Sequence, residues 1–175
     1  YWVKNRNEKT YLFNPSNVNQ EPKIIYDRNY QDRYSDPGSF LTERNIYNKN
    51  VLKIESNSLI LIGDGYSEKG QFPFIDKLSL NDFSSNRIYK SSYTDKLEDI
   101  LDFDTKKNQL LVRIESKSNY PNYYFKNLNG RRVNKITDFK NPFEKLNQVD
   151  KQVISYKRND GVELSGVLYL SLIHI

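Results

Sequence analysis

Two strand-like stretches, Leu59-Ile60-Leu61-Ile62 and Leu110-Leu111-Val112-Arg113, begin 51 residues apart in a chain of 175 residues. Three further matches keep almost the same spacing. Val51–Glu55 matches Ile100–Asp104 at a spacing of 49 residues. At a spacing of 48 residues, Leu80-Asn81-Asp82 matches Leu128-Asn129-Gly130, and Arg87-Ile88-Tyr89 matches Lys135-Ile136-Thr137. A period of about 40–50 residues made of short strands is typical of β-propeller blades. The repeat therefore predicts four-stranded antiparallel units that stack on one another, with a β-sandwich of accidental spacing as the alternative.

The composition favours an all-β protein. Aromatic residues make up 14% of the chain, alanine is absent, and Tyr, Phe, Ile and Val are residues that prefer strands. There is no cysteine, which excludes disulfides and a cysteine nucleophile. The longest apolar run has four residues, far short of the roughly 20 that a transmembrane helix needs. The 27 bases and 22 acids are interleaved, so the net charge of +5 does not indicate a nucleic-acid footprint.

The flanks of the repeat predict part of an earlier blade. Thr10–Phe13 and Lys23–Tyr26 are expected to form its third and fourth strands, and Tyr1–Val3 the end of its second. The alternation in Leu52–Glu55 predicts a strand with one buried face. Helical spacing of Leu97, Ile100 and Leu101 leaves a short helical turn open before the strand that follows.

The C-terminal part falls out of step with the repeat. Val153–Arg158, the turn Asn159-Asp160-Gly161 and Val162–Tyr169 predict a β-hairpin. We therefore expect propeller blades over 1–148 and the start of a second domain over 149–169. Residues 170–175 resemble the translation of a sequencing-library adaptor, which would make His174, the only histidine, an artefact.

Several motifs, in this order and spacing, resemble the prolyl oligopeptidase family of serine peptidases, and most closely its glutamyl endopeptidase branch. The family resemblance rests on the hairpin Ile154–Tyr169 that follows the repeat. The finer resemblance rests on Pro22–Arg28 with Tyr34–Ser39, on Gly63-Asp64-Gly65 with Gly70–Asp76, and on Ile136–Phe139 with Asn141-Pro142-Phe143. The chain departs from the family at Ser171, where a proline is expected.

The resemblance implies that the hairpin opens an α/β-hydrolase domain that hydrolyses peptide bonds with a Ser-His-Asp triad. No Gly-x-Ser-x-Gly nucleophile elbow occurs here, so no catalytic residue is assigned and this piece alone is expected to be inactive. The propeller would restrict access to peptides or unfolded protein. No cofactor, metal, nucleic acid or membrane is expected, the location implied is periplasmic or secreted, and the oligomeric state stays open.

A few residues are candidates for binding. Arg28 or Arg33 could hold a substrate carboxylate, although a surface salt bridge is the simpler interpretation. The Gly63-Asp64-Gly65 stretch lacks a P-loop lysine and is interpreted as a wide hairpin loop. The remaining clusters are interpreted as a solvated face (Asp99, Asp102, Asp104) and as an exposed edge strand (Arg131, Arg132, Lys135 beside Tyr123 and Tyr124). A binding or scaffold propeller without catalysis is the main alternative function, and a nucleic-acid-binding β protein a weaker one.

Overall fold

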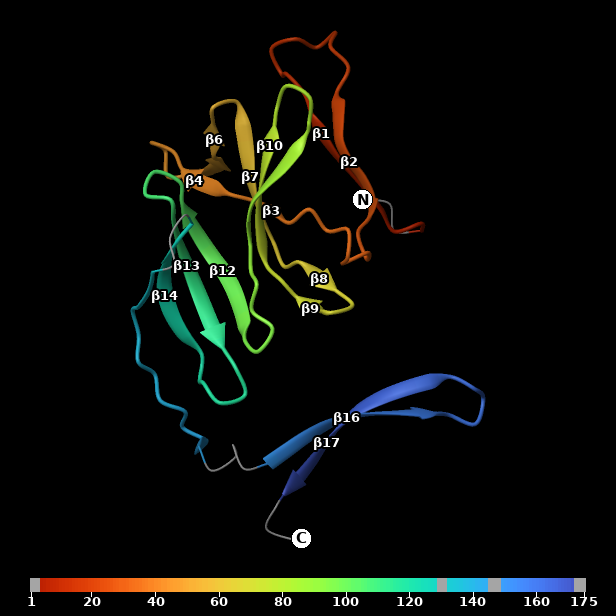
Figure 1. Cartoon of the computed structure of the whole chain (residues 1–175). Helices are drawn as coiled ribbons and strands as arrows, with labels where there is room; N and C mark the ends of the chain where they lie inside the picture. The colour runs from red at the N-terminus through yellow and green to blue at the C-terminus, as the bar shows by residue number, and fades with distance from the viewer. Residues whose placement is uncertain (1–3, 129–131, 145–148, 172–175) are drawn as a thin grey trace.

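The two halves of the repeat form two antiparallel sheets in the computed structural model, which describes residues 4–128, 132–144 and 149–171 (Figure 1). No α-helix occurs within these ranges, so the described part of the chain is all-β, as the composition predicts. The sheets lie side by side, and the chain passes from one to the other through residues 91–96.

The first sheet is built around β7 (Ser58–Gly63). On one side β7 pairs with β10 (Phe74–Ser79), which pairs with β11 (Ser85–Lys90). The other edge of β7 is shared by two short strands, β3 (Ser39–Phe40) and β6 (Ile54–Glu55). Because β7 is flanked on both sides and covered on both faces, its apolar run is almost entirely buried.

The second sheet is a meander of β12 (Leu97–Asp104), β13 (Gln109–Glu115), β14 (Asn122–Asn127) and β15 (Val133–Lys135). Its second, third and fourth strands begin 51, 48 and 48 residues after β7, β10 and β11. The spacing expected from the sequence is therefore confirmed for these three strands. The Asn129-Gly130 turn expected between β14 and β15 lies outside the described residues.

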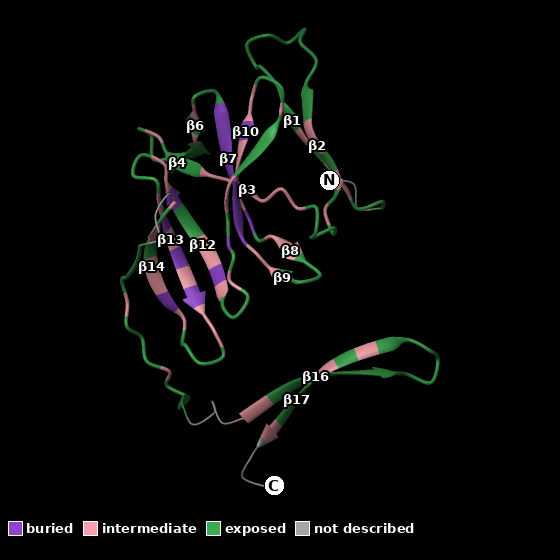
Figure 2. Cartoon of the chain, viewed as in Figure 1, coloured by how far each residue is buried: buried purple, intermediate pink, exposed green. Residues whose placement is uncertain are grey.

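The main core lies between the two sheets. Ile60 and Ile75 of the first sheet pack with Phe103, Leu110 and Val112 of the second. Figure 2 shows this buried contact running along β7 and β13. Burial of each such side chain contributes about 1.5–3 kcal/mol. Hydrophobic burial between the faces therefore joins the sheets, whereas no strand is shared between them.

A second core covers the opposite face of the first sheet. Leu59, Leu61 and Leu78 pack there against Ile25 and Tyr26. The latter two lie in β2 (Lys23–Asn29), which pairs with β1 (Asn7–Leu12). The strands predicted at 10–13 and 23–26 are thus confirmed, and the chain forms three stacked layers. The strand end expected at 1–3 lies outside the described residues.

Two local expectations are wrong. The segment 51–55 is broken at Lys53, whose N–H bonds the Leu41 carbonyl, so β5 (Asn50–Leu52) pairs separately with β4 (Thr42–Arg44). Leu52 and Ile54 are consequently 45% and 57% exposed rather than buried. Residues 97–101 form no helical turn: they belong to β12, and a register shift between Ile100 and Asp102 places Leu101 outside the ladder.

The connection from β7 to β10 is the wide hairpin loop expected around Gly63-Asp64-Gly65. It carries a small hairpin, β8 (Tyr66–Ser67) with β9 (Gly70–Gln71). Gly65 has a φ of +66°, and a Cβ there would lie 1.9 Å from the Phe72 carbonyl oxygen. Only glycine fits this close approach between the two ends of the loop.

The predicted C-terminal hairpin is present as β16 (Val149–Lys157) and β17 (Glu163–Ser171), which pair without a break from Val149–Ser171 to Lys157–Glu163. It forms its own two-stranded sheet and reaches away from the other strands (Figure 1). Leu170 and Ser171 continue β17, and residues 172–175, including His174, lie outside the described part of the chain.

Candidate functional site

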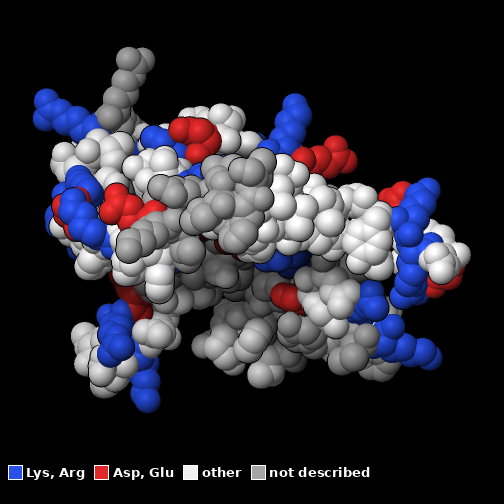
Figure 3. Space-filling model, turned by 90° about the horizontal axis from the view of Figure 1, so that it is seen from below, with Lys and Arg blue, Asp and Glu red and all other residues white. Residues whose placement is uncertain are grey.

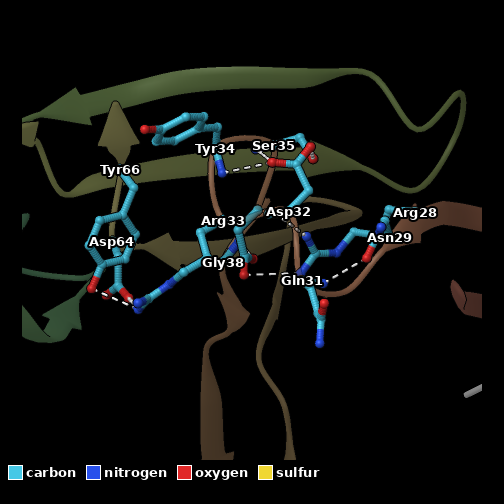
Figure 4. A network of polar contacts seen from close by, with 11 residues as sticks. Arg28, Asn29, Gln31, Asp32, Arg33, Tyr34, Ser35, Gly38, Asp64 and Tyr66 are labelled. Atoms are coloured by element: carbon cyan, nitrogen blue, oxygen red, sulfur yellow. Dashed lines mark hydrogen bonds and ion pairs between the residues drawn. The ribbon is translucent and has the colours of Figure 1, made fainter. Parts of the chain in front are cut away.

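Of the two arginines that the sequence singled out, Arg28 lies near the end of β2 and Arg33 lies in the loop that follows it (Figure 4). Arg28 donates 3.1 Å to the Asp32 carbonyl and 3.0 Å to the Asp36 carboxylate, and its side chain is 16% exposed. Asp36 also accepts the Gly38 N–H at 2.9 Å. Arg28 is therefore engaged by the loop that follows β2, in the salt bridge that was the simpler interpretation.

Arg33 is more open. Its guanidinium donates 2.8 Å to the Tyr66 hydroxyl, lies 4.0 Å from the Tyr66 ring centroid, and is 4.0 Å from Asp64. These contacts tie the loop after β2 to the β8–β9 hairpin, as Figure 4 shows. With 65% of its side chain exposed, Arg33 keeps surface for a further partner.

The loop between the two arginines is held by Asp32. Its carboxylate accepts the Ser35 hydroxyl at 2.8 Å and the Tyr34 N–H at 3.0 Å. These hydrogen bonds, with the Ser35 hydroxyl first, lower the pKa of Asp32 below its usual range. Loop 29–38 is thus ordered by short-range polar contacts of its own.

A large cavity lies where the ends of both sheets meet the C-terminal hairpin. Its volume is about 820 Å³. Its walls come from 69–72 beside β9, from 93–97 before β12, from 115–121 between β13 and β14, and from Val149, Lys151 and Tyr169 of the hairpin. Rings of Phe72, Tyr93, Tyr120, Phe143 and Tyr169 give it an aromatic lining. A ligand of peptide size fits this volume.

Lysines outnumber carboxylates around this cavity. It is lined by Lys69, Lys96, Lys117 and Lys151, but only by Asp95 and Glu115 among the acids. Lys117 lies 3.5 Å from Asp150, whereas the other three have no carboxylate partner among the described residues. Figure 3 shows this end of the molecule from below, with Lys and Arg side chains and Asp and Glu side chains both spread along its outline. The cavity therefore suits an anionic, partly apolar ligand.

A smaller cavity of about 410 Å³ lies on the other side of the β8–β9 hairpin. Tyr26, Tyr34 and Phe74 line it together with Arg87, which bonds Asp76 through two nitrogens at 2.9 and 3.0 Å. Burial, and secondarily the nearby Asp76, raise the pKa of Tyr26. Phe72 lines both cavities.

A buried polar network between the two sheets was not predicted from the sequence. Lys126 donates 3.0 Å to Glu98 and 2.7 Å to the Tyr89 hydroxyl, which itself donates 2.6 Å to Glu98. The Glu98 side chain has no exposed surface. Burial and the Glu98 carboxylate raise the pKa of Tyr89 well above its usual range. Strand alternation through Glu98 and Ile100 was the signal that could have found this inward-facing acid.

The other sequence clusters have structural partners. Asp99 pairs with Arg113 across β12 and β13, and Asp104 accepts the Lys106 and Lys107 N–H groups of the next turn. Lys135 lies in the exposed edge strand β15 and pairs with Asp138. Arg131 lies outside the described residues. No group of three His, Cys, Asp or Glu side chains suited to a metal ion occurs in the ranges described.

Among the residues described, no helix is long and apolar enough to cross a membrane. No family model matches the chain. Its sequence is similar to a probable chloroplastic glutamyl endopeptidase of Oryza sativa subsp. japonica, with 32% identity over 97% of this chain and 20% of the relative. The Arabidopsis thaliana protein of the same description is 31% identical over 97% of this chain and 19% of the relative.

Among solved structures, the AtxE2 isopeptidase with Astexin3-dC4 bound matches with a TM-score of 0.38 and 12% identity, over 95% of this chain and 24% of that one. The chain spans about a fifth of the length of the two curated relatives that it matches. The match covers 97% of this chain. Over this segment the chain is therefore a distant homologue of the glutamyl endopeptidases.

Proposed function

We propose that the chain is the junction between a β-propeller and an α/β-hydrolase domain in a serine peptidase. Residues 1–148 are the last blades of the propeller, and 149–169 are the first hairpin of the catalytic domain. The similarity to glutamyl endopeptidases over 97% of the chain supports this assignment. The hydrolysis itself would be carried out by residues that are not in this segment.

The stacking of the layers supports the propeller. Equivalent strands of the two sheets begin 48–51 residues apart. Strand β7 contributes Leu59 to the interface with β2 and Ile60 to the interface with the second sheet. A blade buries both faces only by contact with its neighbours on either side. The outer face of the second sheet still exposes Leu101 and Phe125, at 47% and 40%, which suits contact with a further blade.

The observation that carries the proposal is the shared cavity of about 820 Å³. Blade loops form most of its wall, and Val149, Lys151 and Tyr169 of the hairpin form the rest. Lys117 of the second sheet also lies 3.5 Å from Asp150 of the hairpin. A cavity between a propeller and a catalytic domain admits an extended peptide and excludes a folded protein, which is how the propeller would gate access.

The charges of this cavity favour acidic peptides. Lys69, Lys96 and Lys151 are without carboxylate partners in the described chain, and ammonium groups around a cleft raise the local concentration of anions. The two relatives are named glutamyl endopeptidases, which agrees with a preference for glutamate-containing substrates. The periplasmic or secreted location implied by the resemblance stays a prediction, since both relatives are named chloroplastic.

The test uses the full-length protein that contains this segment. We expect it to cleave a fluorogenic peptide with a glutamate at the scissile position faster than the matched glutamine peptide, and to be labelled by a serine-directed fluorophosphonate. The 175-residue chain alone should bind the peptides without cleaving them. Binding without hydrolysis or labelling in the full-length protein would favour a scaffold propeller and overturn the proposal.

A further inference from the structure

Two ammonium groups approach the ring of Tyr93, one from the core and one from the cavity. The Lys126 nitrogen lies 4.7 Å from the ring centroid and the Lys96 nitrogen lies 5.4 Å from it. The ring itself packs against the main core and lines the large cavity. Distances below about 6 Å are those at which a cation is attracted to an aromatic ring.

The core side of this arrangement is fixed. Lys126 is 16% exposed and is bonded to both Glu98 and the Tyr89 hydroxyl, so its nitrogen has little freedom to move. Because Lys126 lies against Tyr93, the ring is held by a network that spans both sheets. Tyr93, in the segment between the two sheets, is partly buried and packs against the main core.

The cavity side is open. Lys96 is exposed and has no ion pair among the described residues, although Asp95 and Glu115 line the same cavity. An unpaired lysine on a surface samples many rotamers, and ordering it for a ligand costs entropy. Contact with the Tyr93 ring restrains the Lys96 side chain while leaving its ammonium group available. Lys69, in contrast, has no aromatic contact in the described structure.

We propose that Tyr93 is a positioning residue for substrate specificity, holding Lys96 at the cavity so that this ammonium contacts a carboxylate of an acidic peptide. The inference rests on the proposed function, because it needs the cavity to bind peptide. It makes Lys96 a restrained contact, as Lys151 is beside the Tyr169 ring at 5.4 Å, and Lys69 a looser source of positive charge. Tyr93 acts through Lys96, and its hydroxyl is not required.

The test measures the Kd of a fluorescein-labelled, glutamate-containing peptide and of its glutamine counterpart by fluorescence anisotropy with the 175-residue chain. Tyr93→Leu is expected to weaken binding of the glutamate peptide roughly two- to fivefold, as Lys96→Gln does. The double variant should bind no more weakly than either single variant, because the two residues act as one unit. Binding of the glutamine peptide should stay unchanged.

A further pair of variants separates positioning from packing. Tyr93→Phe should bind like the parent chain, whereas pentafluorophenylalanine at position 93 keeps the ring shape, removes its negative face and should bind like Tyr93→Leu. Lys69→Gln should weaken binding independently, so its effect adds to that of Tyr93→Leu. Tyr47→Leu and Lys49→Gln, in the exposed β4–β5 turn, are the matched controls and should change nothing.

Three results would overturn the inference: an unchanged Kd for Tyr93→Leu, full additivity with Lys96→Gln, or parent-like binding by the pentafluorinated ring. If the parent chain prefers the glutamate peptide but these variants do not matter, only the role of Tyr93 fails. If the parent chain binds neither peptide, the cavity assignment of the proposed function fails with it.

Discussion

Lys126 and Glu98 form an ion pair of 3.0 Å inside the contact between the two sheets, although the Glu98 side chain has no exposed surface. A charge in such a place is unfavourable unless its partners are present, because desolvation costs several kcal/mol for each ion. The Tyr89 hydroxyl completes the arrangement by bonding both of them. The three residues come from β11, β12 and β14, so the network joins one sheet to the other.

Removal of one charge from this pair should be strongly destabilising. We expect Lys126→Met to lower the free energy of unfolding by about 3–5 kcal/mol, because Glu98 stays buried without its partner. The measurement is urea denaturation followed by circular dichroism. The double variant Lys126→Met/Glu98→Met should recover most of the loss, and a single variant that costs less than about 1 kcal/mol would contradict the assignment.

Stability should also fall in alkaline solution because of Tyr89. An unfolded tyrosine has a pKa near 10, whereas burial and the Glu98 carboxylate raise the pKa of Tyr89 in the folded chain. Below about pH 10 both states hold the proton; above it only the folded state does, so the free energy of unfolding decreases as the pH rises. Urea titrations from about pH 8 to 11 should show a shallower decline for Tyr89→Phe than for the parent. Tyr47→Phe, at a site 75% exposed, should leave the slope unchanged.

Glycine at position 38 is predicted to be essential for the loop after β2. Its φ is +89°, and a Cβ there would lie 2.4 Å from the Ile62 carbonyl oxygen of β7. Gly161 has a similar φ of +85° but open space around it, so Gly161→Ala adds backbone strain alone, at most about 1–2 kcal/mol. Gly38→Ala should cost at least about 1 kcal/mol more in urea denaturation. Equal costs would mean that β7 yields without penalty.

Arg28 at the end of β2 and Arg33 in the following loop should respond differently to substitution. Arg28→Gln removes a carbonyl contact and a partly screened ion pair, and we expect a loss of about 1 kcal/mol in the free energy of unfolding. Arg33→Gln should change it by less than about 0.5 kcal/mol, since that side chain is 65% exposed. The measurement compares the urea denaturation midpoints of the two variants. A larger loss for Arg33→Gln than for Arg28→Gln would show that Arg33 contributes more to the stability of the loop.

The sequence predicts the strands well where the side chains alternate and the repeat sets a register. The quartets at 59–62 and 110–113 lie in β7 and β13, and the hairpin around Asp160-Gly161 forms as expected. Turns that contain glycine or asparagine depend mainly on the residues in the turn itself, so they can be predicted from the sequence. The strands expected at 10–13 and 23–26 likewise correspond to β1 and β2.

Contacts between segments far apart in the chain were beyond the reach of the sequence. The break at Lys53 depends on the Leu41 carbonyl, which periodicity does not register. The register shift in β12 allows both Glu98 and Phe103 to face the core. Because the shift interrupts the alternation of the strand, the spacing of the apolar residues around it resembles that of a helical turn. The cavity and its lysines form only when separate segments of the chain come together, so no single sequence motif could predict them.

Strand β7 serves two hydrophobic interfaces at once, through Leu59 and Ile60. Natural variation along this strand is therefore constrained twice, since a change of volume at one position must suit the layers on opposite sides. The exposed β4–β5 hairpin has no such double obligation. In a saturation mutagenesis library, few substitutions should be tolerated along 58–63 and many at 45–49, where a change does not disturb the packing of the layers.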